Sequence, residues 1–304
     1  MEQYLVLDIG GTFVKYAVMT ADAQFVMQGK VPVDHSSEEA MYAALEAVRE
    51  AVAGYEYEGV AISMPGRIDT AAGIAHTGGA FRWLHDYPAA ERYGAVFGKP
   101  ATVANDGKCA AYAESWKGAL ADAESGAAIV LGTGVGGGIV LNGKVWMGYT
   151  GGAGELSGLL VDFNAMGLPF PQSMSALWAN RISAAAISKA YAARKGLESA
   201  DGIMLFDAYE AGDEDAKAVL DEFAFQAATG IMSLQATLDL QRYAIGGGIS
   251  ARQETTELIR KAFDGLYDPL AAFMPYGKPE IVMCRFGNEA NLIGALAFHL
   301  EQQK

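Results

Sequence analysis

Cysteine is scarce in this sequence, which has only Cys109 and Cys284 among its 304 residues. The two are far apart and no CxxC motif occurs, so the chain can build neither a disulfide framework nor a thiolate zinc site. Both cysteines are therefore expected to be small buried residues. The four histidines show no metal-ligand spacing either.

Long apolar runs and basic residues are also lacking. No stretch approaches the ~20 uninterrupted apolar residues of a membrane helix, and no charged-then-apolar signal precedes the first expected strand. With 22 basic against 36 acidic residues, the net charge is -14, which argues against a nucleic-acid partner because phosphate backbones require a basic face. We therefore expect a cytoplasmic protein with no nucleic-acid or membrane partner.

Strand and helix patterns alternate along the chain, and the opening pattern occurs twice. In both halves a strand, a glycine turn and a second strand precede an alternation of helices and strands. Expected strands cover 4–9, 13–19, 24–32, 59–64, 100–105, 127–131, 135–141, 144–148, 242–247 and 279–286, and an Asn-Gly turn precedes the strand at 144–148. Expected helices cover 37–53, 106–118, 174–195, 214–239, 255–263 and 289–300.

This repetition predicts an α/β fold with two lobes. We place the N-terminal lobe at residues 1–118, with a terminal helix of about 290–304 packing back on it, and the C-terminal lobe at 119–289. No Pro/Ser-rich linker separates the lobes, so we expect them to pack as a hinged pair.

Three glycine-bearing turns follow expected strands: DIGGT at 8–12, LGTGVGGG at 131–138 and IGGGI at 245–249. Glycine permits positive φ and removes the side chain that would block a ligand, and successive amides in such turns bind anions. One such turn is most simply a hairpin, but three of them, the first with Asp8, Thr12 and Lys15, predict phosphate binding. The chain has no GxxxxGK[ST] motif, and a strand rather than a helix follows the second turn, so neither a P-loop nor a dinucleotide fingerprint explains the pattern.

Five motifs follow one another along the chain: DIGGT, ANDGKCAAYAE, LGTGVGGGIV, GGAGE and IGGGI. In their order and spacing they resemble the ROK group of sugar kinases and repressors, over essentially the whole chain. The resemblance implies two ribonuclease-H-like lobes of the actin-like ATPase fold with a hinged cleft. The first lobe would carry a phosphate loop, the sugar site and the catalytic aspartate, and the second lobe the other phosphate loop and the adenosine site. The stretch GVAISMPGRIDTAAGIAHTGGAFRWLHDY is most similar to bacterial β-glucoside kinases.

The resemblance also implies ATP and Mg²⁺ as cofactors. Asp106 corresponds to the catalytic base, although as a bare sequence feature it could simply be a helix N-cap. The sugar-binding residues of the family correspond to Asn105, Asp106, Glu155 and Gly79. Asp8 would hold Mg²⁺ directly or through water. The ATP- and phosphate-binding set is Asp8, Gly10, Gly11, Thr12, Lys15, Gly132, Thr133, Gly134, Gly136, Gly247 and Gly248, with the last two beside the adenosine. Lys15 could alternatively be a solvated strand lysine.

The sequence departs from the family just after GGAGE. Most members have a histidine there that contacts the sugar and binds zinc, followed by a CxCGxxGC cluster. Gly158 occupies the histidine position and no cysteine follows, so no zinc is expected. The site is then either inactive or open to a substituent on C1 of the sugar, and the retained polar residues favour the open site.

Aromatic residues near the sugar segment raise a second question about the acceptor. Phe81, Trp83 and Tyr87 could stack on a second sugar ring, but packing in the core or at an interface is the simpler role. The same alternatives hold for Trp146 and Trp178.

The resemblance to β-glucoside kinases implies an ATP-dependent kinase that phosphorylates the 6-hydroxyl of the non-reducing glucose in β-glucosides such as cellobiose-type disaccharides and aryl glucosides. The alternatives are a glucokinase, a fructokinase or an N-acetylmannosamine kinase. A repressor or another non-catalytic sugar-binding protein is disfavoured, because the first strand begins by about Gln3 with no basic helix before it. The resemblance further implies a homodimer that binds a small sugar.

Overall fold

Two units make up the computed structural model, which describes residues 2–303, with the backbone alone at positions 250 and 251. The first unit combines Met1–Lys117, Val145–Ala153 and Glu289–Lys304, and the second combines Gly118–Lys144 and Gly154–Asn288. No pattern in the sequence indicated that the segment Val145–Ala153 belongs with the first unit. Among residues 2–303, no helix has the length and apolar character needed to cross a bilayer.

The sheet of the first unit has the strand order β3 (Phe25–Pro32), β2 (Phe13–Thr20), β1 (Gln3–Ile9), β4 (Val60–Met64), β8 (Ala101–Asn105). β2 is antiparallel to both of its neighbours, β3 and β1, and the strands β1, β4 and β8 are parallel. Both β1 and β4 are buried along nearly their whole length, as expected of strands covered on two faces. Because parallel strands end at the same edge, the residues that follow these three strands become neighbours.

A second five-stranded sheet, formed mainly by the second unit, repeats this order with β11 (Lys144–Trp146), β10 (Val135–Leu141), β9 (Ser125–Leu131), β12 (Arg242–Gly246) and β13 (Glu280–Met283). Again a hairpin, here β9 and β10, is antiparallel, and the strands β9, β12 and β13 are parallel. The repeated α/β architecture predicted from the sequence is therefore confirmed in the strand order.

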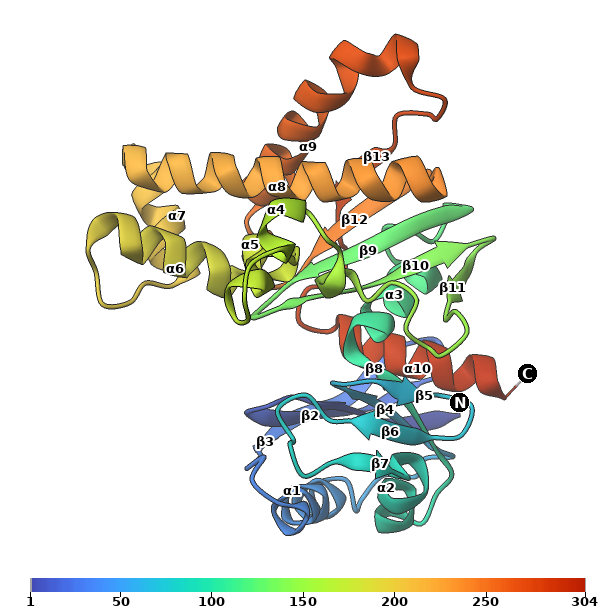
Figure 1. The fold of residues 1–304 in the computed structure, drawn as a ribbon. Helices are drawn as coiled ribbons and strands as arrows, with labels where there is room; N and C mark the ends of the chain where they lie inside the picture. The colour runs from blue at the N-terminus through green and yellow to red at the C-terminus, as the bar shows by residue number, and fades with distance from the viewer. Residues whose placement is uncertain (1, 304) are drawn as a thin grey trace. The chain divides into compact units, whose positions relative to one another are not determined.

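Helices cover both faces of the first sheet (Figure 1). α1 (Glu38–Ala51) and α2 (Ala89–Phe97) pack on one face, and α3 (Asp106–Lys117) and α10 (Ala290–Gln302) pack on the other. α3 and α10 approach so closely that a methyl group on Gly294 would lie 1.6 Å from the carbonyl oxygen of Cys109. A small sheet of β5 (Ile68–Asp69), β6 (Ile74–Thr77) and β7 (His85–Tyr87) was not predicted, because its strands are too short to show a period.

The two cysteines differ in burial. Cys109 is fully buried, and this burial raises the pKa of its thiol far above the usual value. Cys284, which was also predicted to be buried, is only partly so. It directly follows β13, which is the edge strand of the second sheet and is therefore less covered than its neighbours.

The helices of the second unit correct one prediction. The expected helix 174–195 is broken, because Ser183 has an extended backbone (φ -67°, ψ 155°) and its side chain caps the next helix through the Ala186 amide. A helix was also missed at 202–210, where Asp201 provides the N-cap. The helices are α4 (Phe163–Met166), α5 (Ala179–Ile182), α6 (Ala184–Lys195), α7 (Gly202–Glu210), α8 (Glu214–Leu238) and α9 (Gln253–Tyr267).

His299 fixes the end of α10 against the first sheet. Its Nδ1 lies 2.8 Å from the Thr102 hydroxyl and its Nε2 lies 2.9 Å from the Gln303 side-chain amide, while its ring edge packs on Tyr4. A neutral imidazole suits this setting, because one ring nitrogen can donate and the other accept. Burial lowers the pKa of His299 below its ordinary value.

We expect the free energy of unfolding to fall as the pH drops from ~6.5, the ordinary histidine value, toward the lower pKa of folded His299. In that window the unfolded chain takes up the proton and the folded chain does not. Each unit by which folding lowers the pKa corresponds to about 1.4 kcal/mol. Urea unfolding of the wild type and His299→Gln between about pH 8 and about pH 5.5 measures the effect. The variant should show a smaller slope, the exposed-site control His85→Gln should keep the wild-type slope, and equal slopes for all three would contradict the assignment.

Candidate active site

The turn after β1 is a tight glycine hairpin. The Gly10 amide donates to the Phe13 carbonyl at 3.0 Å, and a methyl group on Gly10 would lie 3.2 Å from the same oxygen. Gly11 and Thr12 are exposed at the tip. Exposed main-chain amides and a hydroxyl at the end of a strand form a surface that can bind an anion such as a phosphate.

Asp8 lies at the end of β1 and is only 6% exposed. Its Oδ1 accepts hydrogen bonds from the Ser63 hydroxyl at 3.1 Å and from the Asn291 side-chain amide at 3.0 Å. Its Oδ2 lies 3.4 Å from the ammonium nitrogen of Lys15. Lys15 therefore forms an ion pair with Asp8, a contact that a merely solvated strand lysine would not make.

Sequence reasoning missed both hydrogen-bond donors to Asp8. Ser63 lies inside the apolar run of β4, and Asn291 lies in the first turn of α10. The available signal was weak, since each is a single small polar residue in a largely apolar stretch. Their role depends on strand order and on the return of the chain end to the first unit.

Asp8 is also the residue to test for magnesium binding. A carboxylate oxygen is the type of ligand that Mg²⁺ prefers, usually together with water and nucleotide oxygens. The Oδ2 atom contacts a partly exposed lysine side chain, so a hydrated cation could share or replace that contact. Within residues 2–303, no group of three or more His, Cys, Asp or Glu side chains is arranged to hold a metal.

Asp106 and Asn105 occupy the junction of β8 and α3. The Asn105 side chain caps the helix, because its Oδ1 accepts from the Lys108 amide at 3.2 Å. Its Nδ2 donates to the Gly66 carbonyl at 2.9 Å. Asp106 is the first residue of α3, is partly exposed, and accepts a short-range bond from the Gly107 amide at 2.8 Å. Helix capping, which the sequence left open as an alternative role for Asp106, is thus performed by Asn105.

Gly79 lies beside the turn that follows β4. It has φ 61°, and a methyl group there would lie 3.0 Å from the Cβ of Pro65. The neighbouring Gly66 has φ 106° and approaches the Thr77 carbonyl so closely that no side chain fits. Since Gly66 is also bonded to Asn105, the structure brings Gly79, Asn105 and Asp106 to one edge of the first sheet.

The second unit places two glycine turns side by side. The Gly132 amide donates to the Gly134 carbonyl at 3.0 Å, and the Gly132 carbonyl accepts from the Ala184 amide at 2.8 Å. Gly247 has φ 97°, and a methyl group on it would lie 2.4 Å from the carbonyl oxygen of Leu131. The turn after β12 therefore packs directly on the end of β9.

The predicted phosphate-binding residues of this unit differ in their surroundings. Thr133, Gly134 and Gly248 are exposed, and methyl groups on Gly134 or Gly248 would meet no atom within 4 Å. Gly136 pairs with Val130 in the ladder of β9 and β10, so it lies in a strand rather than in the turn.

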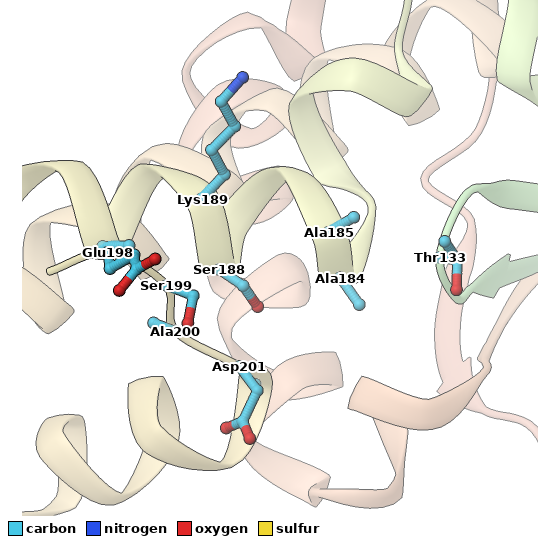
Figure 2. Close-up of a pocket in the computed structure, with 11 residues that line it drawn as sticks. Thr133, Ala184, Ala185, Ser188, Lys189, Glu198, Ser199, Ala200 and Asp201 are labelled. Carbon is cyan, nitrogen blue, oxygen red and sulfur yellow. The ribbon is translucent and has the colours of Figure 1, made fainter.

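A pocket of about 460 Å³ opens beside Thr133 in the second unit. It lies along α6 and against the loop that leads to the start of α7, and the N-caps of these two helices are Ser183 and Asp201. In Figure 2, Ala184 and Ser188 project from the side of α6 that faces Asp201, whereas Lys189 extends away from that side. Pockets of this size accommodate small ligands, and helix N-termini favour anionic groups. The pocket is lined by Thr133, Ala184, Ala185, Ser188, Lys189, Ala192, Glu198, Ser199, Ala200, Asp201 and Gly202.

Glu155 is exposed and precedes a short 3₁₀ turn, Leu156–Gly158. Gly154 before it has φ 74° and packs on the backbone of β10, where a methyl group would lie 3.1 Å from the Gly138 Cα. Gly158 is exposed, and a methyl group there would meet no atom within 4 Å. The position at which the sequence departs from the ROK pattern is therefore open.

Several aromatic residues of the sequence analysis pack in the interior. Phe81 is fully buried and packs edge-to-face on Trp83, which in turn packs on Tyr87 with ring centroids 5.6 Å apart. Trp178 is fully buried and donates from its indole nitrogen to the Gln226 carbonyl at 2.9 Å. For Phe81 and Trp178 the packing alternative holds, whereas Trp146 is 47% exposed.

Comparison with known proteins gives one family for the whole chain. Residues 4–302 match the ROK family. A β-glucoside kinase from Klebsiella pneumoniae is 31% identical over 300 residues, which cover 97% of this chain and 95% of the relative. A glucokinase from Halalkalibacterium halodurans is 28% identical over 318 residues, which cover 96% of this chain and 93% of the relative.

Solved structures give the same fold. The crystal structure of a ROK family glucokinase from Streptomyces griseus, in complex with glucose and AMPPNP, superimposes with a TM-score of 0.82. The match covers 99% of this chain and 100% of that protein at 23% sequence identity. The actin-like ATPase fold expected from the sequence is thus confirmed.

Two adjacent glycines provide a test of the second unit. Gly247→Ala should lower the free energy of unfolding by about 2–4 kcal/mol, because its positive φ is costly for alanine and its methyl group would clash with Leu131. Gly248→Ala is the matched control, since its methyl group would enter open space. Thermal and urea unfolding of both variants measure the difference, and equal stability of the two would show that the close packing on β9 is wrong.

Proposed function

The chain belongs to the ROK family, and from that premise we propose that it transfers the γ-phosphoryl group of ATP to the 6-hydroxyl of the non-reducing glucose in β-glucosides. A sugar kinase of the ROK type is supported by relatives that span nearly the whole chain. The β-glucoside acceptor is the finer part of the proposal. It is supported by 31% identity to a β-glucoside kinase and by the open position at Gly158.

The observation that carries the proposal is the position of Asp106. It is a partly exposed carboxylate at the end of β8 that is relieved of helix capping by Asn105. In the proposed reaction, Asp106 accepts the proton of the sugar 6-hydroxyl while that oxygen bonds to the γ-phosphorus. The bond from the γ-phosphorus to the bridging oxygen breaks, and ADP leaves with the electron pair.

A helix N-terminus stabilises a carboxylate and so makes Asp106 a weak base. This is compatible with phosphoryl transfer, because in a loose transition state the sugar hydroxyl loses its proton late. The orientation of that hydroxyl then matters more than the basicity of Asp106. Asn105 retains a second amide hydrogen and a second lone pair beyond its two protein bonds, and we assign them to the sugar hydroxyls together with Glu155. Gly79 allows the sugar to approach the backbone beside Pro65.

For the donor, we assign the phosphates to the exposed turns. Gly10, Gly11 and Thr12 supply amides and a hydroxyl from the first unit, and Gly132, Thr133 and Gly134 supply them from the second. The pocket beside Thr133 and the backbone at Gly247 and Gly248 are assigned to the adenosine. In these assignments an acidic protein binds a polyanion through main-chain amides and helix N-termini instead of a basic surface.

Asp8 would hold Mg²⁺, directly or through water, because its oxygens are the donors that this ion prefers. When bound, Mg²⁺ neutralises charge that builds up on the phosphate oxygens. Ser63 and Asn291 keep the Asp8 carboxylate oriented, and Lys15 adds a positive charge next to it.

We expect Asp106→Asn to lower kcat by more than about 100-fold while the KM for the sugar stays within a few-fold. The substitution removes the proton acceptor but keeps the shape of the side chain, and Asn105 still caps α3. A coupled assay of ADP release measures both constants, and unchanged thermal unfolding verifies the fold. A variant that retains a tenth of the wild-type kcat would refute the role of Asp106.

The acceptor preference is tested with cellobiose, gentiobiose, salicin and glucose in the presence of ATP and Mg²⁺. The open position at Gly158 should give at least one β-glucoside a kcat/KM above that of glucose. Gly158→His, which fills that position, should lower kcat/KM for the glycosides more than for glucose by about tenfold. Highest kcat/KM for free glucose in the wild type would favour a glucokinase instead.

A further inference from the structure

Tyr149 is the most exposed large apolar side chain among the described residues, with a relative exposure of 103%. It lies in the segment Val145–Ala153 of the first unit. A tyrosine ring that is wholly in water contributes no burial to the stability of the fold. Packing within the fold therefore does not account for its position.

The backbone on either side of Tyr149 is held in place. The Ala153 amide donates to the Met147 carbonyl at 3.1 Å, which closes the segment into a loop. Gly148 and Gly151 have φ values of 70° and 77°, which few other residues adopt. A methyl group on Gly151 would lie 2.9 Å from the Ile68 carbonyl, so the loop also packs on the segment after β4.

A buried lysine ties the base of this loop to α3. Lys108 is 0% exposed, and its ammonium group donates a hydrogen bond to the Ala153 carbonyl. Burying an ammonium group is costly unless it is bonded, so this contact strongly favours one position of the loop. Lys108 follows Asp106 by two residues, and its own amide donates to the Asn105 side chain. The loop is thus joined to the segment that carries both proposed acceptor residues.

We infer that Tyr149 is a specificity-determining residue that stacks on the second ring of the acceptor, meaning the aryl group or the reducing-end sugar of a β-glucoside. The inference rests on the proposed function. The face of a pyranose or phenyl ring is largely C–H or π surface, which a tyrosine ring contacts favourably while the polar edges of the sugar stay in water. Because the loop is held at its base, little conformational entropy is lost when the ligand binds.

Three aromatic residues named in the sequence analysis, Phe81, Tyr87 and Trp178, do not offer this surface. Phe81 and Trp178 are fully buried, and Tyr87 donates a 2.6 Å hydrogen bond to Glu38 while its ring packs on Trp83. Tyr149 combines a free ring face with attachment to the acceptor segment of the first unit.

The test measures the KM of the wild type, Tyr149→Ala and Tyr149→Phe for four acceptors: phenyl β-glucoside, cellobiose, methyl β-glucoside and glucose. The alanine variant should raise the KM for the two acceptors with a second ring by about tenfold and leave the other two within twofold. Tyr149→Phe should behave like the wild type, because stacking needs the ring and not the hydroxyl. Tyr55→Ala, at a 37% exposed tyrosine elsewhere in the first unit, is the matched control and should change no KM.

Equal changes for all four acceptors, or no change with any of them, would overturn the role of Tyr149. A wild type that phosphorylates only free hexoses would refute the proposed function instead. In that case calorimetric binding of phenyl β-glucoside to the wild type and Tyr149→Ala decides the question separately. Equal affinity of the two proteins, or no binding to the wild type, would then also overturn the inference.

Discussion

One buried carboxylate holds together the end of the first unit that carries the glycine hairpin after β1. Asp8 belongs to β1, Ser63 to β4 and Asn291 to α10, so the two hydrogen bonds of Asp8 join three segments that are far apart in sequence. A carboxylate can be buried at low cost only when its oxygens are bonded, and here Lys15 supplies a compensating charge. The same group that anchors the terminal helix therefore also lies directly beneath the glycine hairpin proposed to bind phosphate.

The glycine turns serve two distinct physical purposes. Gly66 and Gly247 are required because a side chain would collide with the neighbouring backbone, so they bring segments together. Gly134 and Gly248 meet nothing within 4 Å, so they leave main-chain amides open to a ligand. A protein with a net charge of -14 can in this way offer local positive potential without a basic surface.

The proposed acceptor specificity depends on a short stretch of chain. The segment Val145–Ala153 carries Tyr149, and Glu155 and Gly158 follow within a few residues. Lys108 binds the end of this segment and Asn105 binds the amide of Lys108, so one chain of contacts leads from the loop to Asp106. Changes in a few residues of such a loop can alter the acceptor without altering the phosphoryl-transfer residues.

The sequence by itself determined the α/β class, the repeated halves and the glycine turns, because these depend on local periodicity and on residue types with few conformational alternatives. It could not determine that Asn105 rather than Asp106 caps α3, that Ser183 interrupts the helix expected over 174–195, or that Cys284 lies only partly buried. It also gave no sign of the roles of Ser63, Asn291 and Lys108, or of the exposure of Tyr149. Those features were decided by the tertiary structure, because each depends on which distant segments the strand order and the returning terminal helix bring into contact.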